Sequence, residues 1–199
     1  MTLPGVILAG GRATRMGGGD KGARLVGGQT LFARVIARLA PQCAPLAINA
    51  NGDPARLAFG LPVLPDSLPD HPGPLAGVLA GLDWAAGIGA PAIVTVAADT
   101  PFFPADLVAR LQAAAGPAGL ALAASADETG RMQRHPTFGL WPVALRHDLR
   151  AALEGGLRKI VLWTDGHGAG SAAFSSDPFD PFFNVNTPED IAIAEALAG

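Results

Sequence analysis

Residues 6–22 of the sequence read VILAGGRATRMGGGDKG, a short apolar run followed by six glycines and several charged side chains. The apolar run at 6–9, stopped by two glycines, is typical of a strand that is buried on both faces of a sheet. Glycine has no Cβ, so its backbone N–H groups can turn toward an anion, and Arg15 and Lys21 add positive charge. The stretch therefore predicts a phosphate-binding loop after the first strand.

Other interpretations of the glycine stretch fit the residues less well. Residues 17–22 formally match G-x-G-x-x-G, but they begin well past the end of the first strand, unlike a dinucleotide-binding turn. Lys21 stands between Asp20 and Gly22, which excludes the G-K-[ST] of a Walker loop. A flexible linker would lack apolar anchors, whereas this stretch follows a strand directly. A solvated loop lysine remains the alternative for Lys21.

The length and composition of the chain indicate a small globular protein. The length of 199 residues suits a single domain over 1–199. Hydrophobic residues make up 49% of the chain and charged residues 16%, a composition that argues against disorder. Mean hydropathy is +0.32, but no apolar stretch reaches the roughly 18–20 residues of a membrane span, so we expect a soluble protein with no membrane partner. With one cysteine, Cys43, and no N-terminal export signal, we expect a reducing cytoplasm.

Charge narrows the class of ligand. The formal net charge is -3 and the basic residues are scattered along the chain, so no patch suited to a nucleic-acid backbone is expected. One cysteine and scattered histidines cannot form a zinc site of usual spacing, and no G-x-S-x-G of a serine hydrolase is present. An anionic ligand should therefore be a small molecule.

Alternating strand and helix patterns predict an α/β fold, with a mostly parallel sheet in a three-layer α/β/α arrangement. Thr30 is expected to cap the first helix, and Pro104 to stand at the first position of another. Residues 160–163 fit either type of element. Strands are expected at 6–9, 46–48, 62–64, 92–97, 120–124 and 137–141, and helices at 31–39, 75–84, 104–111, 145–153 and 188–197.

Polar residues follow four of the expected strands. Gly10 and Gly11, Asn49, Asp66 and Asp99 each stand just beyond a strand's carboxyl end. Open α/β sheets bind ligands at this edge, so we expect these residues to meet in one crevice.

The sequence resembles the nucleotidyltransferases with a glycosyltransferase-A-like, Rossmann-like fold, and among them the molybdenum cofactor guanylyltransferases. The resemblance spans nearly the whole chain. LAGG followed by RMGG is shared by many relatives, whereas DK at 20–21 together with NVNTPE at 184–189 is more particular. The matching motifs stand at 8–11, 15–18, 20–21, 49–51, 66–68, 72–77, 99–101, 135–137 and 184–189.

The resemblance implies an enzyme that transfers GMP from GTP to the phosphate of molybdopterin, with Mg²⁺, and releases pyrophosphate. It implies that Lys21 holds the phosphates of GTP and that Asp99 binds the metal. Together with Arg15, whose positive charge belongs to the glycine loop, these residues are expected to act in catalysis. Asn49 and Asp66 would bind toward the nucleoside. The implied nucleotide-binding residues are Leu8, Ala9, Gly10, Gly11, Lys21, Asn49, Asp66 and Asp99. Other proteins of molybdenum cofactor synthesis and acceptor molybdoenzymes are the further partners that it suggests.

The transfer needs positioning and neutralisation of charge rather than a base, because the attacking phosphate is already ionised at neutral pH. His135 is accordingly expected to be structural. Arg158 and Lys159 offer positive charge to the anionic pterin, although a solvated helix face explains them as well. Asn184 and Asn186 are candidates for binding the pterin or for completing the metal sphere, or else they shape the turn before the last helix.

Other functions stay open at this point. The same scaffold could use CTP with the same pterin, or transfer a nucleotide to a sugar phosphate. A noncatalytic carrier of nucleotide or pterin is a different class, and it would have no need of a metal ligand at Asp99. The alternative for Asp99 is a cap for the helix that follows.

Overall fold

The computed structural model describes residues 2–9, 24–68, 73–157 and 159–198. Within them a seven-stranded sheet has the order β5-β4-β1-β6-β8-β7-β9, and a separate hairpin joins two short strands. β8 runs antiparallel to both of its neighbours and the other pairs are parallel, which confirms the expected mostly parallel sheet. The strands of the sheet are β1 Gly5–Leu8, β4 Leu46–Asn49, β5 Val63–Leu64, β6 Ala92–Ala97, β7 Ala121–Ala126, β8 Met132–Pro142 and β9 Gly170–Phe174; the hairpin is β2 Leu25–Val26 and β3 Gln29–Thr30.

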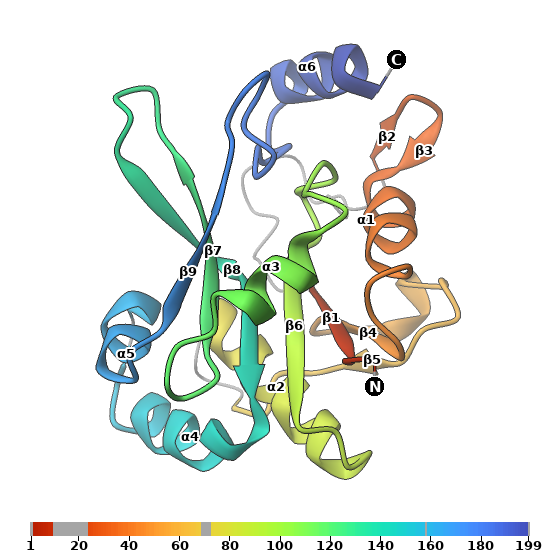
Figure 1. Cartoon of the computed structure of the whole chain (residues 1–199). Helices are drawn as coiled ribbons and strands as arrows, with labels where there is room; N and C mark the ends of the chain where they lie inside the picture. The colour runs from red at the N-terminus through yellow and green to blue at the C-terminus, as the bar shows by residue number, and fades with distance from the viewer. Residues whose placement is uncertain (1, 10–23, 69–72, 158, 199) are drawn as a thin grey trace.

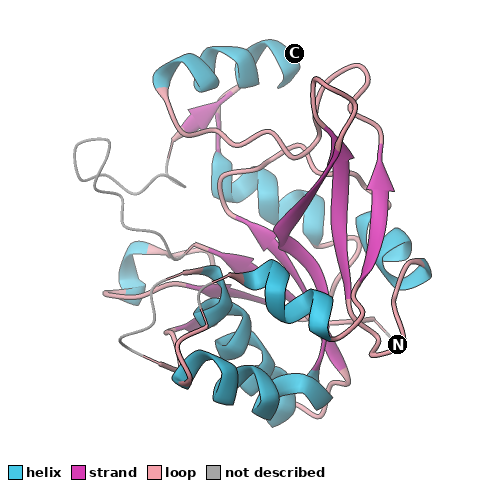
Figure 2. Cartoon of the chain, turned by 90° about the vertical axis from the view of Figure 1, so that its left-hand side faces the viewer, coloured by secondary structure: helices cyan, strands magenta, loops and turns pink. Residues whose placement is uncertain are grey.

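Helices cover both faces of the sheet, as Figures 1 and 2 show. One buried cluster joins α1 and α3 to one face, and a second joins α2, α4 and α5 to the other. Successive residues of β1 alternate between the two, since Val6 packs with α2 and Ile7 packs with α1. The helices are α1 Leu31–Leu39, α2 Pro74–Gly87, α3 Leu107–Ala113, α4 Arg146–Glu154, α5 Ile160–Gly166 and α6 Pro188–Ala198, with short 3-10 turns η2 Pro54–Arg56 and η3 Val143–Leu145.

Local sequence explains two of these elements well. The Thr30 hydroxyl accepts from the Ala33 N–H at 3.1 Å, which confirms it as the cap of α1. In α2, Gly81 allows a close approach to the sheet, because a Cβ there would lie 2.8 Å from the Ile93 side chain. The helix therefore lies tight against β1 and β6.

The structure differs from the sequence prediction in several elements. Pro104 does not open a helix: its carbonyl accepts from the Leu107 N–H in a preceding turn, and α3 begins at Leu107. Residues 160–163 lie in the helix α5, and β8 begins five residues before the expected strand at 137. The hairpin β2–β3 and the edge strand β9 were not predicted, because two-residue strands and small-residue strands carry little apolar periodicity.

A third apolar cluster joins the β2–β3 hairpin to the C-terminal segment. Val26 of the hairpin, Phe102 after β6, Val185 and Ala194 of α6 are all buried in it. Figure 1 shows α6 beside the hairpin at the top of the molecule. The C-terminal segment is therefore packed against residues that flank the ends of the central strands.

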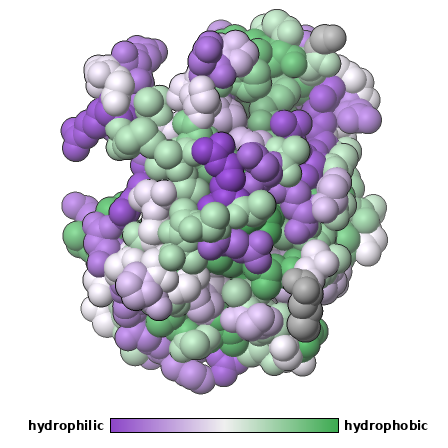
Figure 3. All heavy atoms as spheres, in the orientation of Figure 1, coloured by the Kyte–Doolittle hydropathy of each residue, from purple (hydrophilic) through white to green (hydrophobic). Residues whose placement is uncertain are grey.

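The positive mean hydropathy reflects the buried core. On the face seen in Figure 3, hydrophilic and hydrophobic residues are mixed, with apolar colour over α6, where Ile193 is exposed. None of the helices in the described part of the chain is both long and apolar enough to cross a membrane.

Candidate active site

The end of β1 lies in the middle of the sheet edge. Leu8 is opposite Asn49 of β4 on one side and Ala97 of β6 on the other. The Ala9 N–H donates to the Asn49 carbonyl at 2.9 Å, and the Leu8 carbonyl accepts from the Ala98 N–H at 3.1 Å. These two backbone groups of Leu8 and Ala9 thus take part in sheet pairing, and their contact with GTP stays a prediction.

Asn49 and Asp66 lie in direct contact, as expected from their positions after two neighbouring strands. The Asn49 Nδ2 group donates to Asp66 Oδ1 at 2.9 Å and to the Leu64 carbonyl at 3.0 Å. Asn51 adds a two-way contact, because its Nδ2 donates to Asp66 Oδ2 at 2.7 Å and its Oδ1 accepts from the Asp66 N–H at 2.9 Å. The Asp66 carboxylate is therefore held in place by two amides.

The start of α2 fixes the buried member of this set. Asn49 is only 2% exposed, and a Cβ at Gly77 would lie 2.1 Å from its Oδ1 atom. Only glycine allows the helix to pass so close to the amide. Gly77 thus belongs to the support of the site, within the motif at 72–77.

Asp99 lies two residues beyond β6 and beside the C-terminal segment. Its carbonyl accepts from the Val185 N–H at 2.8 Å. The buried Thr100 hydroxyl lies 2.5 Å from Asn184 Oδ1 and 3.4 Å from Asp99 Oδ1. The fold therefore brings Asn184 next to Asp99 across more than eighty positions of sequence.

The donor chemistry at this place fits a hard cation. Asp99 offers a carboxylate and Asn184 an amide oxygen, and Mg²⁺ prefers oxygen ligands together with water and substrate phosphates. Within residues 2–9, 24–68, 73–157 and 159–198, no three His, Cys, Asp or Glu side chains form a cluster for a metal held by protein alone. A metal here would need oxygen atoms of the substrate as further ligands.

Asn186 takes part in the turn before α6. Its N–H and that of Thr187 each donate to Asp190 Oδ2 at 2.8 Å, and the Thr187 hydroxyl accepts from the Asp190 N–H at 3.1 Å. The hydrogen bond from Asn186 is the largest of the effects that lower the pKa of Asp190. The backbone of Asn186 thus takes part in this turn, and both roles considered for its side chain, shaping the turn and binding a ligand, stay predictions.

The structure describes only some of the remaining predicted site residues. Gly10, Gly11, Arg15, Lys21 and Arg158 lie outside the described residues. Lys159 is exposed at the start of α5. Figure 1 shows α5 at the left of the molecule, away from the end of β6, so the structure does not place the start of α5 beside the residues that follow β6.

Sequence reasoning missed three residues that the structure joins to this site, namely Asn51, Thr100 and Ser67. Asn51 and Thr100 stand inside motifs noted for the resemblance, but neither was chosen as a site residue. The available indication that Asn51 belongs to the site was its position two residues after Asn49. Ser67, which follows Asp66, donates to Asp83 of α2 at 2.5 Å.

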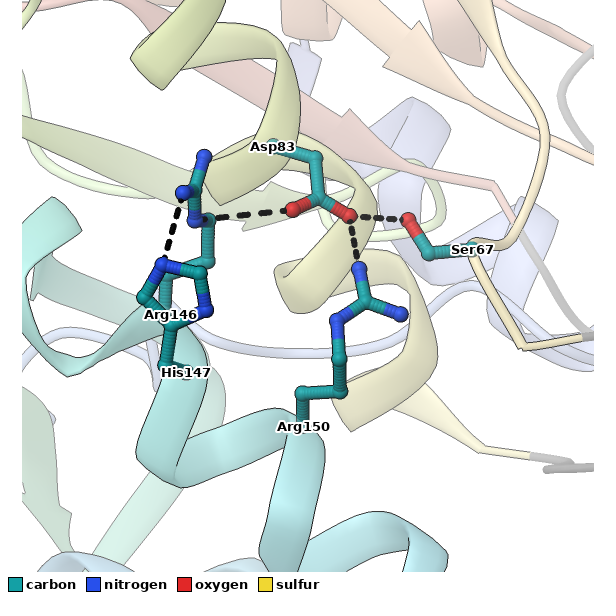
Figure 4. Close-up of polar contacts among 5 residues, drawn as sticks. All are labelled: Ser67, Asp83, Arg146, His147 and Arg150. Carbon is teal, nitrogen blue, oxygen red and sulfur yellow. Dashed lines mark hydrogen bonds and ion pairs between the residues drawn. The ribbon is translucent and has the colours of Figure 1, made fainter.

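Asp83 also binds the helix α4, as Figure 4 shows. Its Oδ2 atom lies 2.7 Å from an Arg150 nitrogen, and its Oδ1 atom lies 3.7 Å from the Arg146 Nε atom. These contacts connect α4 through Asp83 and Ser67 to the loop that carries Asp66. The network supports the site without contributing a side chain to the sheet edge.

Comparison with known proteins identifies the family of the chain. Residues 5–167 match the MobA-like NTP transferase domain. The chain is 55% identical over 202 residues to the molybdenum cofactor guanylyltransferase of Bradyrhizobium sp. (98% of this chain and 93% of the relative), and 51% identical over 199 residues to that of Cereibacter sphaeroides (99% and 97%).

Solved structures share the fold at lower identity. The molybdopterin-guanine dinucleotide biosynthesis protein A of Archaeoglobus fulgidus superposes with a TM-score of 0.73 at 21% identity, covering 98% of both chains. The 2-C-methyl-D-erythritol 4-phosphate cytidylyltransferase of Thermus thermophilus superposes with a TM-score of 0.71 at 24% identity, covering 100% of this chain and 99% of that one. The chain therefore belongs to the family of MobA-like NTP transferases, together with the molybdenum cofactor guanylyltransferases, and it has their α/β nucleotidyltransferase fold.

Proposed function

We propose that this chain is a molybdenum cofactor guanylyltransferase, which transfers GMP from GTP to molybdopterin and releases pyrophosphate. The observation that carries the proposal is the 55% identity to a relative of that name over 98% of the chain. The contact between Asn49 and Asp66 beside the end of β1 supports it, because this is the edge at which such sheets bind nucleotides.

The nucleotide would lie across the end of β1. Asp66 retains acceptor capacity beyond its two amide contacts, since a carboxylate has about four lone-pair positions, and it would accept hydrogen bonds from the nucleoside. Leu8, Ala9 and the loop with Gly10 and Gly11 would contact GTP through the backbone. Lys21 and Arg15 would neutralise its phosphates, which favours departure of pyrophosphate.

Asp99 would hold Mg²⁺, with oxygen atoms of the substrate phosphates and of Asn184 or Asn186 as further ligands. The bound ion supplies charge neutralisation at the α-phosphate and the leaving group. Asp99 and Asn184 would in this way orient the acceptor phosphate for in-line attack. The attacking phosphate needs no base, so no histidine is assigned to proton transfer.

The acceptor pterin would lie on the side of Asn184 and Asn186. Arg158 and Lys159 were predicted from sequence as cations for its negative charges, but α5, which follows Lys159, lies away from the end of β6 that leads to Asp99, so the proposal does not rest on Lys159. We also propose that the reaction takes place in the cytoplasm, which the single cysteine of the sequence, the unpaired Cys43, supports.

The direct test is incubation of the purified chain with GTP, MgCl₂ and molybdopterin, followed by mass analysis for the guanine dinucleotide and by measurement of pyrophosphate. Parallel reactions with CTP, ATP and UTP test the choice of base. We expect a dinucleotide with GTP only. A cytosine dinucleotide as the main product, or nucleotide binding without pyrophosphate release, would contradict the proposal.

A further inference from the structure

A polar cluster lies apart from the residues assigned to substrates. Ser125 of β7 is 2% exposed, and its Oγ atom lies 2.7 Å from His135 Nε2 and 3.1 Å from Asp180 Oδ1. His135 belongs to the neighbouring strand β8, whereas Asp180 lies in the connection between β9 and α6. One buried hydroxyl thus joins two strands of the sheet to the C-terminal segment.

The hydrogen atoms in this cluster have one consistent arrangement. A carboxylate only accepts hydrogen bonds and a hydroxyl carries one proton, so Ser125 donates to Asp180 and accepts from the Nε2–H of His135. Burial lowers the pKa of His135, and the nearby Asp180 carboxylate opposes that shift. Because the Ser125 proton points to Asp180 and the hydroxyl is buried, the cluster is not a nucleophilic site.

The cluster also holds the residues that follow Asp180. The Phe182 N–H donates to Asp180 Oδ1 at 3.0 Å. The Phe182 ring stacks on His135, with centroids 4.3 Å apart and planes at 24°, and it packs edge-on against Phe138. Residues 180–182 are therefore fixed to β7 and β8 by polar and aromatic contacts together.

The other end of the same short segment reaches the proposed metal site. Two residues after Phe182, Asn184 contacts Thr100, and the Val185 N–H donates to the Asp99 carbonyl. Figure 1 shows the β9–α6 connection at the end of the sheet where β6 and β7 finish. Residues 180–185 thus connect the Ser125 cluster, which they contact through Asp180, to Asp99, which they contact through Val185.

We propose that Ser125, His135 and Asp180 are positioning residues, which hold Asn184 beside Asp99 and thereby set the affinity for the acceptor pterin. The inference rests on the proposed function, in which Asn184 faces the acceptor. GTP binding at Asn49 and Asp66 should be independent of the cluster, because these residues are held by α2 and by β4 and β5.

Ser125→Ala tests the inference with little change in volume. We expect the KM for molybdopterin to rise about tenfold, as for loss of a buried hydrogen-bonding group, and the KM for GTP to stay within about twofold. Asp180→Asn keeps an acceptor oxygen and should stay close to the parent chain, whereas Asp180→Ala should behave like Ser125→Ala. Ser171→Ala is the control for loss of a serine hydroxyl, since the hydroxyl of the exposed Ser171 on β9 accepts from the Arg134 side chain and lies outside the Ser125 cluster.

Amide hydrogen exchange gives a second measurement that needs no substrate. In Ser125→Ala, peptides covering 180–187 should exchange faster, while peptides of β1 and β6 keep their protection. Equal increases in both KM values, or an unchanged KM for molybdopterin, would overturn the inference. Failure of the parent chain to form any dinucleotide would instead refute the proposed function, and unchanged exchange at 180–187 would still refute the anchoring.

Discussion

The side-chain amide of Asn49 donates to the Asp66 carboxylate over 2.9 Å and so joins the end of β4 to a residue two positions beyond β5. Asn49 is buried beneath Gly77, which fixes its position. The position of Asp66 at the sheet edge is therefore set by packing deep in the sheet and helix. In the proposed function, this contact would hold Asp66 in place before the nucleotide binds.

Asp66→Ala should raise the KM for GTP about tenfold, or roughly 1.4 kcal/mol, because it removes an acceptor that the two asparagines hold in place. Steady-state kinetics with varied GTP measures the effect. Asp53→Ala is the control, since Asp53 caps only the short turn η2. An unchanged KM for GTP in Asp66→Ala would remove Asp66 from the nucleotide site.

Asp99→Ala should lower pyrophosphate release by about 100-fold, in line with the loss of a group that stabilises developing charge. Circular dichroism should show an intact fold, and chelation of Mg²⁺ should abolish turnover in the parent chain. Asp106→Ala provides the comparison, because Asp106 is an exposed partner of Arg110 on α3. Turnover that survives in Asp99→Ala would assign the metal to another residue.

Lys21→Ala should weaken GTP binding at least about tenfold, since a unit charge pair at 4 Å contributes about 4 kcal/mol at an effective dielectric of 20. Titration calorimetry with GTP and Mg²⁺ measures the affinity. Lys159→Ala removes the same charge elsewhere and should leave GTP affinity unchanged. Equal losses in the two variants would indicate a general charge effect instead of a phosphate contact.

Asp83→Ala should lower the free energy of unfolding by about 1 kcal/mol, because its ion pairs with Arg146 and Arg150 are partly exposed to solvent. The loss should shrink at high salt, where such pairs are screened. Urea unfolding at low and at high ionic strength measures both effects. A loss that does not depend on salt would assign the role of Asp83 to its hydrogen bond with Ser67.

Cys43 should make stability fall at alkaline pH. Burial raises the pKa of its thiol from 9.0 to about 12, so the unfolded chain loses this proton first as the pH rises. The stabilisation is complete below pH 9 and declines between the two pKa values, by at most about 1.4 kcal/mol per pH unit. Thermal unfolding between pH 8 and 11 measures the decline, which should be smaller in Cys43→Ala. An equal decline in both chains would contradict the effect.

Patterns that are local in sequence predicted much of the fold. The strand 92–97 matches β6 in full, and Thr30 and Pro188 mark the starts of α1 and α6. These elements follow from apolar periodicity and from caps, which depend on neighbours within a few residues. The meeting of Asn49 with Asp66 was also predictable, because parallel strands end at a common edge.

The sequence by itself determined the α/β class, the family resemblance and the polar residues at the strand ends. Apart from the contact between Asn49 and Asp66, only the tertiary structure decided what those residues touch. Asn184 lies beside Thr100, and Ser125 joins His135 to Asp180, through contacts between segments that no periodicity relates. The physical reason is that such contacts arise where separate segments pack together, the C-terminal connection against the sheet and β7 beside β8, and no short window of residues encodes that packing.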